Sequence, residues 1–386
     1  MSYATNRQLI YLDNAAAVPV TAESLAFMAK TAPLVIGNQE GIHCAAFHTR
    51  DLLAQAAENI INLITGKSNE ISLLWSDSGT TLLNTALRLP YFSTGNIITT
   101  NLEHPALATA IQRSGAQIAI VKTPAGKIDT EHLTTLLNKD TRLVAIHHVQ
   151  SETGIIQDLL TISKLVKTKA PQALFLVDTV QAAGKFSIPW DAAKLDFCFI
   201  SGHKFGSPGG AAMLYRDKVL PNGANFSVFF KKLRDQEYLL GRPEPLIQLT
   251  MAASLQRCYG KLKQQLAIVS ELNLLLRNEL QSITLPNRQQ PIFTVAAETA
   301  SPYIVHILLP EFQGAVLVRM LSEYNIAVSA GTACAAETNN PGKTLPAMGY
   351  KKDDGYSTLR ISLWHNTTAT MIHEFVRIFK QLLADY

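Results

Sequence analysis

The spacing of apolar positions predicts that the first two-thirds of the chain alternates short buried strands with amphipathic helices. The strand-length runs are apolar at nearly every position, which is typical of a parallel sheet covered on both faces. Helices between such strands act as right-handed crossovers and give an α/β fold. The predicted strands are Ile71–Trp75, Asn96–Thr100, Gln117–Val121, Arg142–Val149, Leu174–Asp178, Phe197–Ile200 and Ala211–Tyr215, and the predicted helices are Thr80–Arg88, Pro105–Gly115, Thr130–Asn138 and Leu159–Lys169.

The pattern changes after residue 250 and predicts a second, smaller α+β domain. One long helix is predicted over Ala252–Leu280, followed by a break rich in Pro, Asn and Gln and by a shorter helix over Gly314–Tyr324. A last helix is predicted from apolar residues at helical spacing, namely Ile372, Phe375, Val376, Phe379, Leu382 and Leu383. We therefore predict a large domain over residues 15–255 and a small domain over residues 1–14 plus 256–386.

Composition and charge narrow the classes of function. Of the 386 residues 47% are hydrophobic and only 17% are charged, so the chain can bury a large core. The net charge of +4 comes without any block of Lys or Arg, which argues against nucleic-acid binding. No apolar run is long enough for a membrane span, and residues 1–9 show no secretory signal. The four widely spaced cysteines form neither a disulfide framework nor a metal-binding pattern, so we expect a reduced, cytoplasmic protein without a metal.

Two loops that directly follow predicted strands carry candidate chemistry. In Ser201-Gly202-His203-Lys204 the glycine allows close approach of a ligand, and Ser and His can donate to a phosphate. A lysine buried there would have the depressed pKa that a nucleophile needs. Asp178 ends another strand and would face the same crevice, where a buried carboxylate needs a cation such as a pyridinium nitrogen. On these residues alone, a structural lysine and an aspartate that caps a turn remain alternatives.

A series of short motifs extends over nearly the whole chain. In chain order they are Tyr11-Leu12-Asp13-Asn14-Ala15-Ala16, Gly37-Asn38, His43, Ser78-Gly79-Thr80-Thr81, Glu103-His104, Glu152-Thr153-Gly154, Asp178-x-x-Gln181, Ser201-Gly202-His203-Lys204, Ser329-Ala330-Gly331-Thr332-Ala333-Cys334 and Leu359-Arg360-Ile361-Ser362. Each is weak alone, but their order and spacing are specific. Together they resemble the class V aminotransferase group and, within it, the cysteine desulfurases. The resemblance implies a fold-type-I transferase that depends on pyridoxal phosphate and forms a homodimer.

The resemblance also implies a role for each candidate residue. Lys204 would bind the cofactor covalently and move protons, and Asp178 would keep the pyridine nitrogen protonated. Gln181 would bind the phenolic oxygen, while His104 would stack on the ring and belong to the catalytic set. Further cofactor contacts are assigned to Thr80, Thr81, Ser151, Ser201, His203 and Arg242, and substrate contacts to Asn14 and Arg360. Arg360 would clamp the substrate carboxylate, a bidentate task that suits a guanidinium group.

Cys334 decides which chemistry is favoured. Its surroundings, Ser329 to Glu337, are rich in Ser, Gly and Ala, which is typical of a mobile loop. A thiol there could take the sulfur of bound L-cysteine as a persulfide, release L-alanine and pass the sulfur to an acceptor protein. The acceptor would serve iron–sulfur cluster assembly or thiolation. Cys198 is expected in the core, and Cys44 and Cys258 are expected to be structural.

Three departures from the resemblance keep alternatives open. Gln150-Ser151 stands where many relatives carry two asparagines, and the shorter Ser151 would need a water to reach the phenolic oxygen. Leu82-Leu83 replaces acidic and small residues after the Ser-Gly-Thr-Thr turn. Arg242 replaces a hydroxyl that reaches the phosphate of the neighbouring subunit, unless it points to solvent. The alternatives are another class V reaction, as in an aminotransferase or a C–S lyase, or an idle protein that binds the cofactor and serves as a partner.

Overall fold

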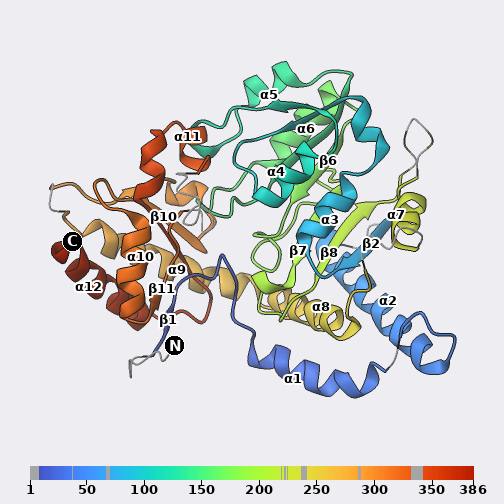
Figure 1. The fold of residues 1–386 in the computed structure, drawn as a ribbon, viewed down its shortest axis with the longest axis horizontal. Helices are drawn as coiled ribbons and strands as arrows, with labels where there is room; N and C mark the ends of the chain where they lie inside the picture. The colour runs from blue at the N-terminus through green and yellow to red at the C-terminus, as the bar shows by residue number, and fades with distance from the viewer. Residues whose placement is uncertain are drawn as a thin grey trace.

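A seven-stranded sheet forms the centre of the protein (Figure 1). The structure is a computed structural model that describes residues 8–36, 38–66, 70–218, 220, 223, 225–235, 241–285, 288–331 and 342–386. The strand order is β2-β8-β7-β6-β5-β3-β4, and every neighbouring pair is parallel except the two that contain β8. The strands are β2 (Ile71–Ser76), β3 (Asn96–Thr99), β4 (Gln117–Ile120), β5 (Thr141–His147), β6 (Leu174–Asp178), β7 (Phe197–Ser201) and β8 (Ala211–Arg216). The predicted α/β fold with a mainly parallel sheet is confirmed.

Helices cover both faces of this sheet because its strands are apolar on both. In β6, Leu174 and Leu176 join the core on one face, and Phe175 and Val177 join the core on the other. Burying each such side chain contributes about 1.5–3 kcal/mol. The first face carries α3 (Gly79–Ala86), α4 (Pro105–Gln112) and α7 (Phe226–Asp235), and the second carries α2 (Cys44–Thr65), α5 (Thr130–Leu136), α6 (Leu159–Lys169) and α8 (Pro245–Gly260).

Residues from both ends of the sequence build a second region. Strand β1 pairs in parallel with β11, and β12, β10 and β9 form an antiparallel sheet. The elements are β1 (Ile10–Tyr11), β9 (Ile292–Phe293), β10 (Ile304–Leu308), β11 (Ile326–Ala327), β12 (Thr358–Ser362), α9 (Leu262–Gln281), α10 (Gly314–Glu323), α11 (Thr344–Met348) and α12 (Ala369–Asp385). One continuous apolar core runs from the central sheet into this region. The predicted domain boundaries at 14/15 and 255/256 therefore stay a prediction.

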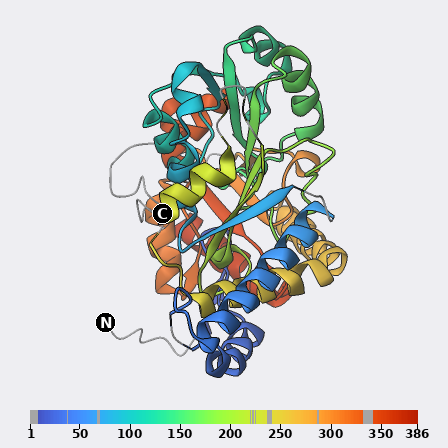
Figure 2. The same ribbon diagram turned by 90° about the vertical axis from the view of Figure 1, so that its right-hand side faces the viewer.

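Several helices differ from the sequence prediction, and α7 is one that it did not include. The long helix is in fact two, because α8 ends at Gly260 and Lys261 leaves the helical conformation with φ −121° and ψ 16°. Glycine has a low helix propensity, which favours a break there. Helices α1 (Ala22–Thr31) and α2 were not predicted, and Figure 2 shows both beside α8. Within the described residues, no helix is both long enough and apolar enough to cross a membrane.

The cysteines divide into buried and exposed groups. Cys198 and Cys258 are buried, and burial raises the pKa of their thiols to about 12 and about 11. Cys44 is exposed at the first position of α2, so the expectation that it packs as a structural residue is wrong. Cys334 lies outside the described residues.

Candidate active site

The predicted site residues gather at the carboxyl ends of the parallel strands. Asp178 ends β6, Ser201 ends β7, and Lys204 follows in the turn Gly202–Lys204. Thr81 lies in the first turn of α3, after β2, and His104 caps α4, after β3. The carboxyl ends of parallel strands share one edge of a sheet, where ligands bind. His104, Asp178 and Lys204 are close enough to shift one another's pKa, so the fold brings the central candidates together.

Lys204 is held by backbone carbonyls instead of a carboxylate. Its Nζ donates to the oxygens of Ala15 and Ala16 at 2.9 and 2.7 Å. Burial and, secondarily, the charge of Arg360 lower the Lys204 pKa to about 8, against an opposing effect of Asp178. The turn requires glycine at position 202, since any Cβ there would collide with the carbonyl oxygen of Gly209. A lysine with this pKa reaches the neutral, nucleophilic form near physiological pH.

Asp178 is a buried carboxylate in ion-pair contact with no lysine or arginine in the part of the chain that the structure describes. The Val180 N–H donates to its Oδ1 at 3.0 Å. Burial raises the pKa of Asp178, while that hydrogen bond and the nearby His104 oppose the rise. Because a carboxylate without a counter-charge is costly in such a place, a cationic group brought against it would be stabilised. Asp178 therefore fits a protonated ring nitrogen.

His104 and the residue before it have different surroundings. His104 Nδ1 accepts from the Ala106 N–H at 3.2 Å, and the ring stays accessible at the rim. Partial desolvation lowers the His104 pKa, with Lys204 adding to the effect, so the ring is neutral and able to pack on another aromatic ring. Glu103 is buried and accepts from His147 Nδ1 at 3.0 Å, and His147 lies opposite Asp178 in the β5–β6 register. Sequence analysis missed this Glu103–His147 pair.

Several donors near the start of α3 and the β7 turn suit an anion. Ser78 caps α3 by accepting from the Thr80 N–H at 3.2 Å, and a Cβ added at Gly79 would meet nothing within 4 Å. The Ser201 Oγ lies 2.9 Å from His203 Nδ1. Burial, followed by the charge of Lys204, lowers the His203 pKa to about 4, so its ring is a neutral donor. Free N–H groups of a helix start together with hydroxyl groups bind phosphate well.

Arg360 reaches the site from β12 in the second region. Its Nη2 pairs with Asp13 Oδ1 at 2.6 Å, and its Nη1 donates to the Ser151 carbonyl at 3.0 Å. The buried Nε has no hydrogen-bond partner among the described residues, so its N–H is available to a ligand carboxylate. Ser151 thus contributes its backbone oxygen to Arg360. Asn14 is buried beside this group, and its amide nitrogen donates to the Ser362 carbonyl at 2.9 Å.

Gln181 and Lys185 lie deeper on the same side of the site. The Gln181 Nε2 donates at 2.8 Å to the Ala15 carbonyl that also accepts from Lys204. The Gln181 Oε1 accepts from Lys185 Nζ at 2.9 Å. Sequence analysis missed Lys185, although its place four residues after Gln181 was a usable signal, because residues i and i+4 share a face in a helical turn.

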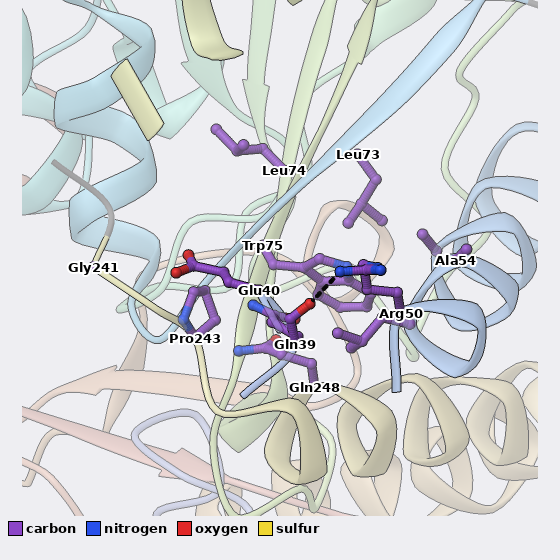
Figure 3. A pocket seen from close by; sticks show the side chains of 12 residues that line it. Gln39, Glu40, Arg50, Ala54, Leu73, Leu74, Trp75, Gly241, Pro243 and Gln248 are labelled. Carbon is purple, nitrogen blue, oxygen red and sulfur yellow. Dashed lines mark hydrogen bonds between the residues drawn. The ribbon is translucent and has the colours of Figure 1, made fainter. Parts of the chain in front are cut away.

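One predicted residue, Arg242, is not brought into this group, and another cannot be placed. Cys334 lies outside the described residues, but Ser329, five positions before it, exchanges backbone hydrogen bonds of 3.1 and 2.7 Å with Arg360. Arg242 is exposed. Its neighbours Gly241 and Pro243 line a separate cavity of about 600 Å³ between α2 and β2 (Figure 3). Trp75 and Arg50 also line it, and Arg50 donates to the Gln39 carbonyl at 2.8 Å.

The donor set at the strand ends fits an organic cofactor better than a metal. The described residues contain no group of three or more His, Cys, Asp or Glu side chains placed to hold a metal ion. A lysine of lowered pKa, a buried carboxylate, an arginine with an unpartnered nitrogen and a helix start flanked by hydroxyl groups are present instead. These groups match a molecule with a reactive carbonyl, a cationic ring nitrogen and a phosphate.

Comparisons with known proteins identify the family to which this chain belongs. The aminotransferase class-V family matches residues 10–228, and this protein belongs to that family. The chain is 26% identical to NifS of Bacillus subtilis strain 168 over 388 residues, covering 97% of this chain and 94% of NifS. It is 27% identical to the cysteine desulfurase IscS of Pseudoalteromonas translucida over 386 residues, covering 96% and 92%. The X-ray structure of a NifS-like protein from Rickettsia africae matches with a TM-score of 0.82 at 25% identity, covering 98% of this chain and 100% of that one. The predicted resemblance to cysteine desulfurases and the fold-type-I architecture are confirmed.

Proposed function

We propose that this protein is a cysteine desulfurase that depends on pyridoxal phosphate. The C–S bond of L-cysteine breaks, an S–S bond forms at the Cys334 sulfur, and the substrate carbon gains a proton. The products are L-alanine and a persulfide, so atoms and electrons balance without an external oxidant. The observation that carries the proposal is a convergence at the edge of the sheet where ligands bind. Lys204 and Asp178 have no ion-pair partner among the described residues, and Arg360, although paired with Asp13, has an Nε–H without a hydrogen-bond partner there.

Each residue of the site has a task that its surroundings support. When bound, pyridoxal phosphate supplies an aldehyde that condenses with amines and a ring that withdraws electrons. Lys204 would hold the cofactor covalently and later move a proton at its Nζ, which the lowered pKa permits. Asp178 would keep the ring nitrogen protonated, and His104 would cover the ring and exchange protons beside Lys204. The phosphate would be held by Thr80, Thr81, Ser201 and His203, and the phenolic oxygen by Gln181 and, through a water, Ser151.

The substrate is oriented by residues of the second region. Arg360 uses its unpartnered Nε for the carboxylate of L-cysteine, while Asp13 and the Ser151 carbonyl fix the rest of its guanidinium group. Asn14 keeps the chain beside Arg360 through its bond to Ser362. Cys334 then takes the sulfur. The short connection from Ser329, which is bonded to Arg360, supports a thiol that works near the bound substrate.

The proposal extends to a homodimer and to a protein that accepts the sulfur. On the surface around α2, Ile42 is 91% exposed and Phe47 is 48% exposed, close in sequence to residues that line the cavity of Figure 3. A second copy that covers this surface would bring the exposed Arg242 of one subunit toward the other. We expect Arg242 to bind the neighbouring phosphate.

Replacing Arg242 tests that contact. The Arg242→Ala variant is expected to bind the cofactor about threefold to tenfold more weakly, because one hydrogen bond to a charged group is lost near solvent. Equilibrium dialysis measures the affinity, and Arg377→Ala, an exposed arginine on α12, is the control. Equal affinity in the two variants would mean that Arg242 points to solvent.

A single-turnover reaction tests the proposed function. Purified protein loaded with pyridoxal phosphate is mixed with L-cysteine, its visible spectrum is followed, and its intact mass and released alanine are measured. We expect a gain of one sulfur that is lost in Cys334→Ala and kept in Cys44→Ala, since Cys44 is an exposed thiol that reports nonspecific capture. A spectral change without that sulfur would indicate another class V reaction. A spectrum that ignores cysteine would indicate an idle, cofactor-binding partner protein.

A further inference from the structure

Lys185 is a buried lysine that the proposed reaction does not use. Only 2% of its surface is exposed, and among the described residues no carboxylate lies within ion-pair distance of its Nζ. Burial, with smaller contributions from the charges of Lys204 and Arg360 and an opposing effect of the Cys258 thiol, lowers the Lys185 pKa to about 7. Keeping an ammonium group in such a place costs folding free energy. Its position therefore requires an explanation other than stability.

The contacts of Lys185 point in two directions. Its Nζ donates to Gln181 Oε1 at 2.9 Å. On the other side it lies 5.7 Å from the ring centre of Tyr303 and 5.9 Å from that of Trp364. Both rings are buried and flank the antiparallel sheet that carries Arg360, since Tyr303 precedes β10 and Trp364 follows β12. Lys185 thus joins the loop after β6 to the region that would hold the substrate.

The same contacts decide which way the Gln181 amide faces. While Lys185 is protonated, its ammonium group can only donate, so the amide oxygen must face Lys185. The Ala15 carbonyl can only accept, so the amide nitrogen must face Ala15, where it shares that acceptor with Lys204. The two requirements agree. The Gln181 amide is therefore fixed in one of the two orientations that differ by exchange of its oxygen and nitrogen.

We propose that Lys185 is a positioning residue that fixes Gln181 with its N–H₂ toward Lys204 and the cofactor ring, and anchors that orientation on Tyr303 and Trp364. This inference rests on the proposed function, in which Gln181 donates to the phenolic oxygen of pyridoxal phosphate. Lys185 acts on the site through Gln181, and the orientation follows from hydrogen-bond direction.

The test is a cycle of four proteins loaded with pyridoxal phosphate: the unsubstituted protein, Lys185→Met, Gln181→Ala and the double variant. The visible absorption of each protein is recorded as a function of pH in the absence of substrate. The pH midpoint of the absorption change and the cofactor affinity are then compared among the four proteins. The shift of this midpoint in Gln181→Ala gives the full effect of losing the Gln181 amide. Lys185→Met is expected to shift the midpoint by about half of that amount or more and to add nothing in the Gln181→Ala background. Lys167→Met, which removes a lysine at the opposite edge of the sheet, is the control and should leave the midpoint unchanged.

Stability separates a positioning role from a structural one. Removing an uncompensated buried charge leaves a protein equally or more stable, so the melting temperature of cofactor-free Lys185→Met at pH 6 should not fall. A lower melting temperature with an unchanged midpoint would overturn the proposal, as would additive shifts in the double variant. If Lys185→Met does not fold, Lys185→Arg keeps the donors and must keep the original midpoint. A shift as large as that of Gln181→Ala would then contradict the proposal. An unsubstituted protein without visible absorption would instead refute the proposed function.

Discussion

Asp196 and Asp178 are buried aspartates on the same sheet but at opposite edges. At the amino ends of the strands, Asp196 accepts from the Phe175 N–H at 2.8 Å and pairs with Lys167 at 3.0 Å and with Lys218. At the carboxyl ends, Asp178 has only a backbone partner among the residues that the structure describes, and Lys204 is bonded to carbonyls. Charge that the chain compensates by itself serves stability. Charge left without a partner marks the edge that receives a ligand, since perturbed groups gather at functional sites.

The largest effect is expected from a comparison of the lysines at the two edges. Lys204→Met should lower desulfuration about a thousandfold or more, because both the covalent attachment and the proton transfer are lost. Lys167→Met should leave the rate within about twofold, since it lies at the opposite edge. The measurement is alanine formation together with intact mass after borohydride reduction, which retains the cofactor on its lysine. A cofactor mass retained on Lys204→Met would show that the attachment lies elsewhere.

The two aspartates should separate activity from stability. Asp178→Asn is expected to lower turnover about a hundredfold while the cofactor-free protein stays at least as stable, because a buried carboxylate of raised pKa is removed. Asp196→Asn should instead cost about 2 kcal/mol of unfolding free energy, less than a fully buried pair because Lys218 reaches solvent. Urea unfolding measures the stability of both variants, and steady-state kinetics measure their turnover. A loss of stability in Asp178→Asn together with a loss of turnover in Asp196→Asn would contradict the comparison.

Arg360 tests whether a group left without a partner at the ligand-facing edge binds the substrate. Arg360→Lys keeps a positive charge but loses the Nε–H that has no partner among the described residues. We expect the KM for L-cysteine to rise about tenfold, with a smaller fall in kcat, because the clamp on the carboxylate is weakened. The control is cofactor affinity, which should stay unchanged. An unchanged KM would place the substrate carboxylate away from Arg360.

The last prediction concerns the pH dependence of stability. Lys204 and Lys185 have pKa values of about 8 and about 7 in the folded protein, below the value of about 10.4 for a free lysine. The unfolded chain therefore binds more protons than the folded protein over this pH range, and cofactor-free protein should gain about 3–4 kcal/mol of stability as pH rises from 7 to 9. Unfolding in urea at several pH values measures this gain. A Lys185→Met and Lys204→Met double variant should lose most of it, and a gain that persists there would have another source.

Features set by neighbouring residues could be predicted from the sequence, and features set by distant contacts could not. Strand β6 was predicted at its observed bounds because Leu174 to Val177 are all apolar and Asp178 ends the run. The reversed direction of β8 could not be predicted, since an apolar run fits either direction. Lys185 was missed because its burial depends on Tyr303 and Trp364, more than a hundred residues away.

In the candidate site, too, features set by neighbouring residues could be predicted and features set by distant contacts could not. Motif residues at strand ends, such as Lys204, were placed correctly by their local sequence. The contact that Ser151 makes with Arg360 uses a backbone carbonyl, which carries no side-chain signature in the sequence. Helix α2 had a readable pattern in Leu53, Ile60 and Ile64, but its many polar and small residues diluted it.

The pairing of the first and last parts of the sequence sets an order of assembly. Asn14 is bonded to Ser362 and Asp13 to Arg360, across 348 and 347 positions of the chain. Contacts this distant close the longest loops and form slowly. During synthesis all strands of the central sheet are made well before β12 leaves the ribosome. The ligand-facing edge of the sheet therefore lacks Arg360 until β12 is in place. Cofactor capture would then be a late step, and a chain truncated before β12 would keep most of its core yet lack the arginine proposed to bind the substrate.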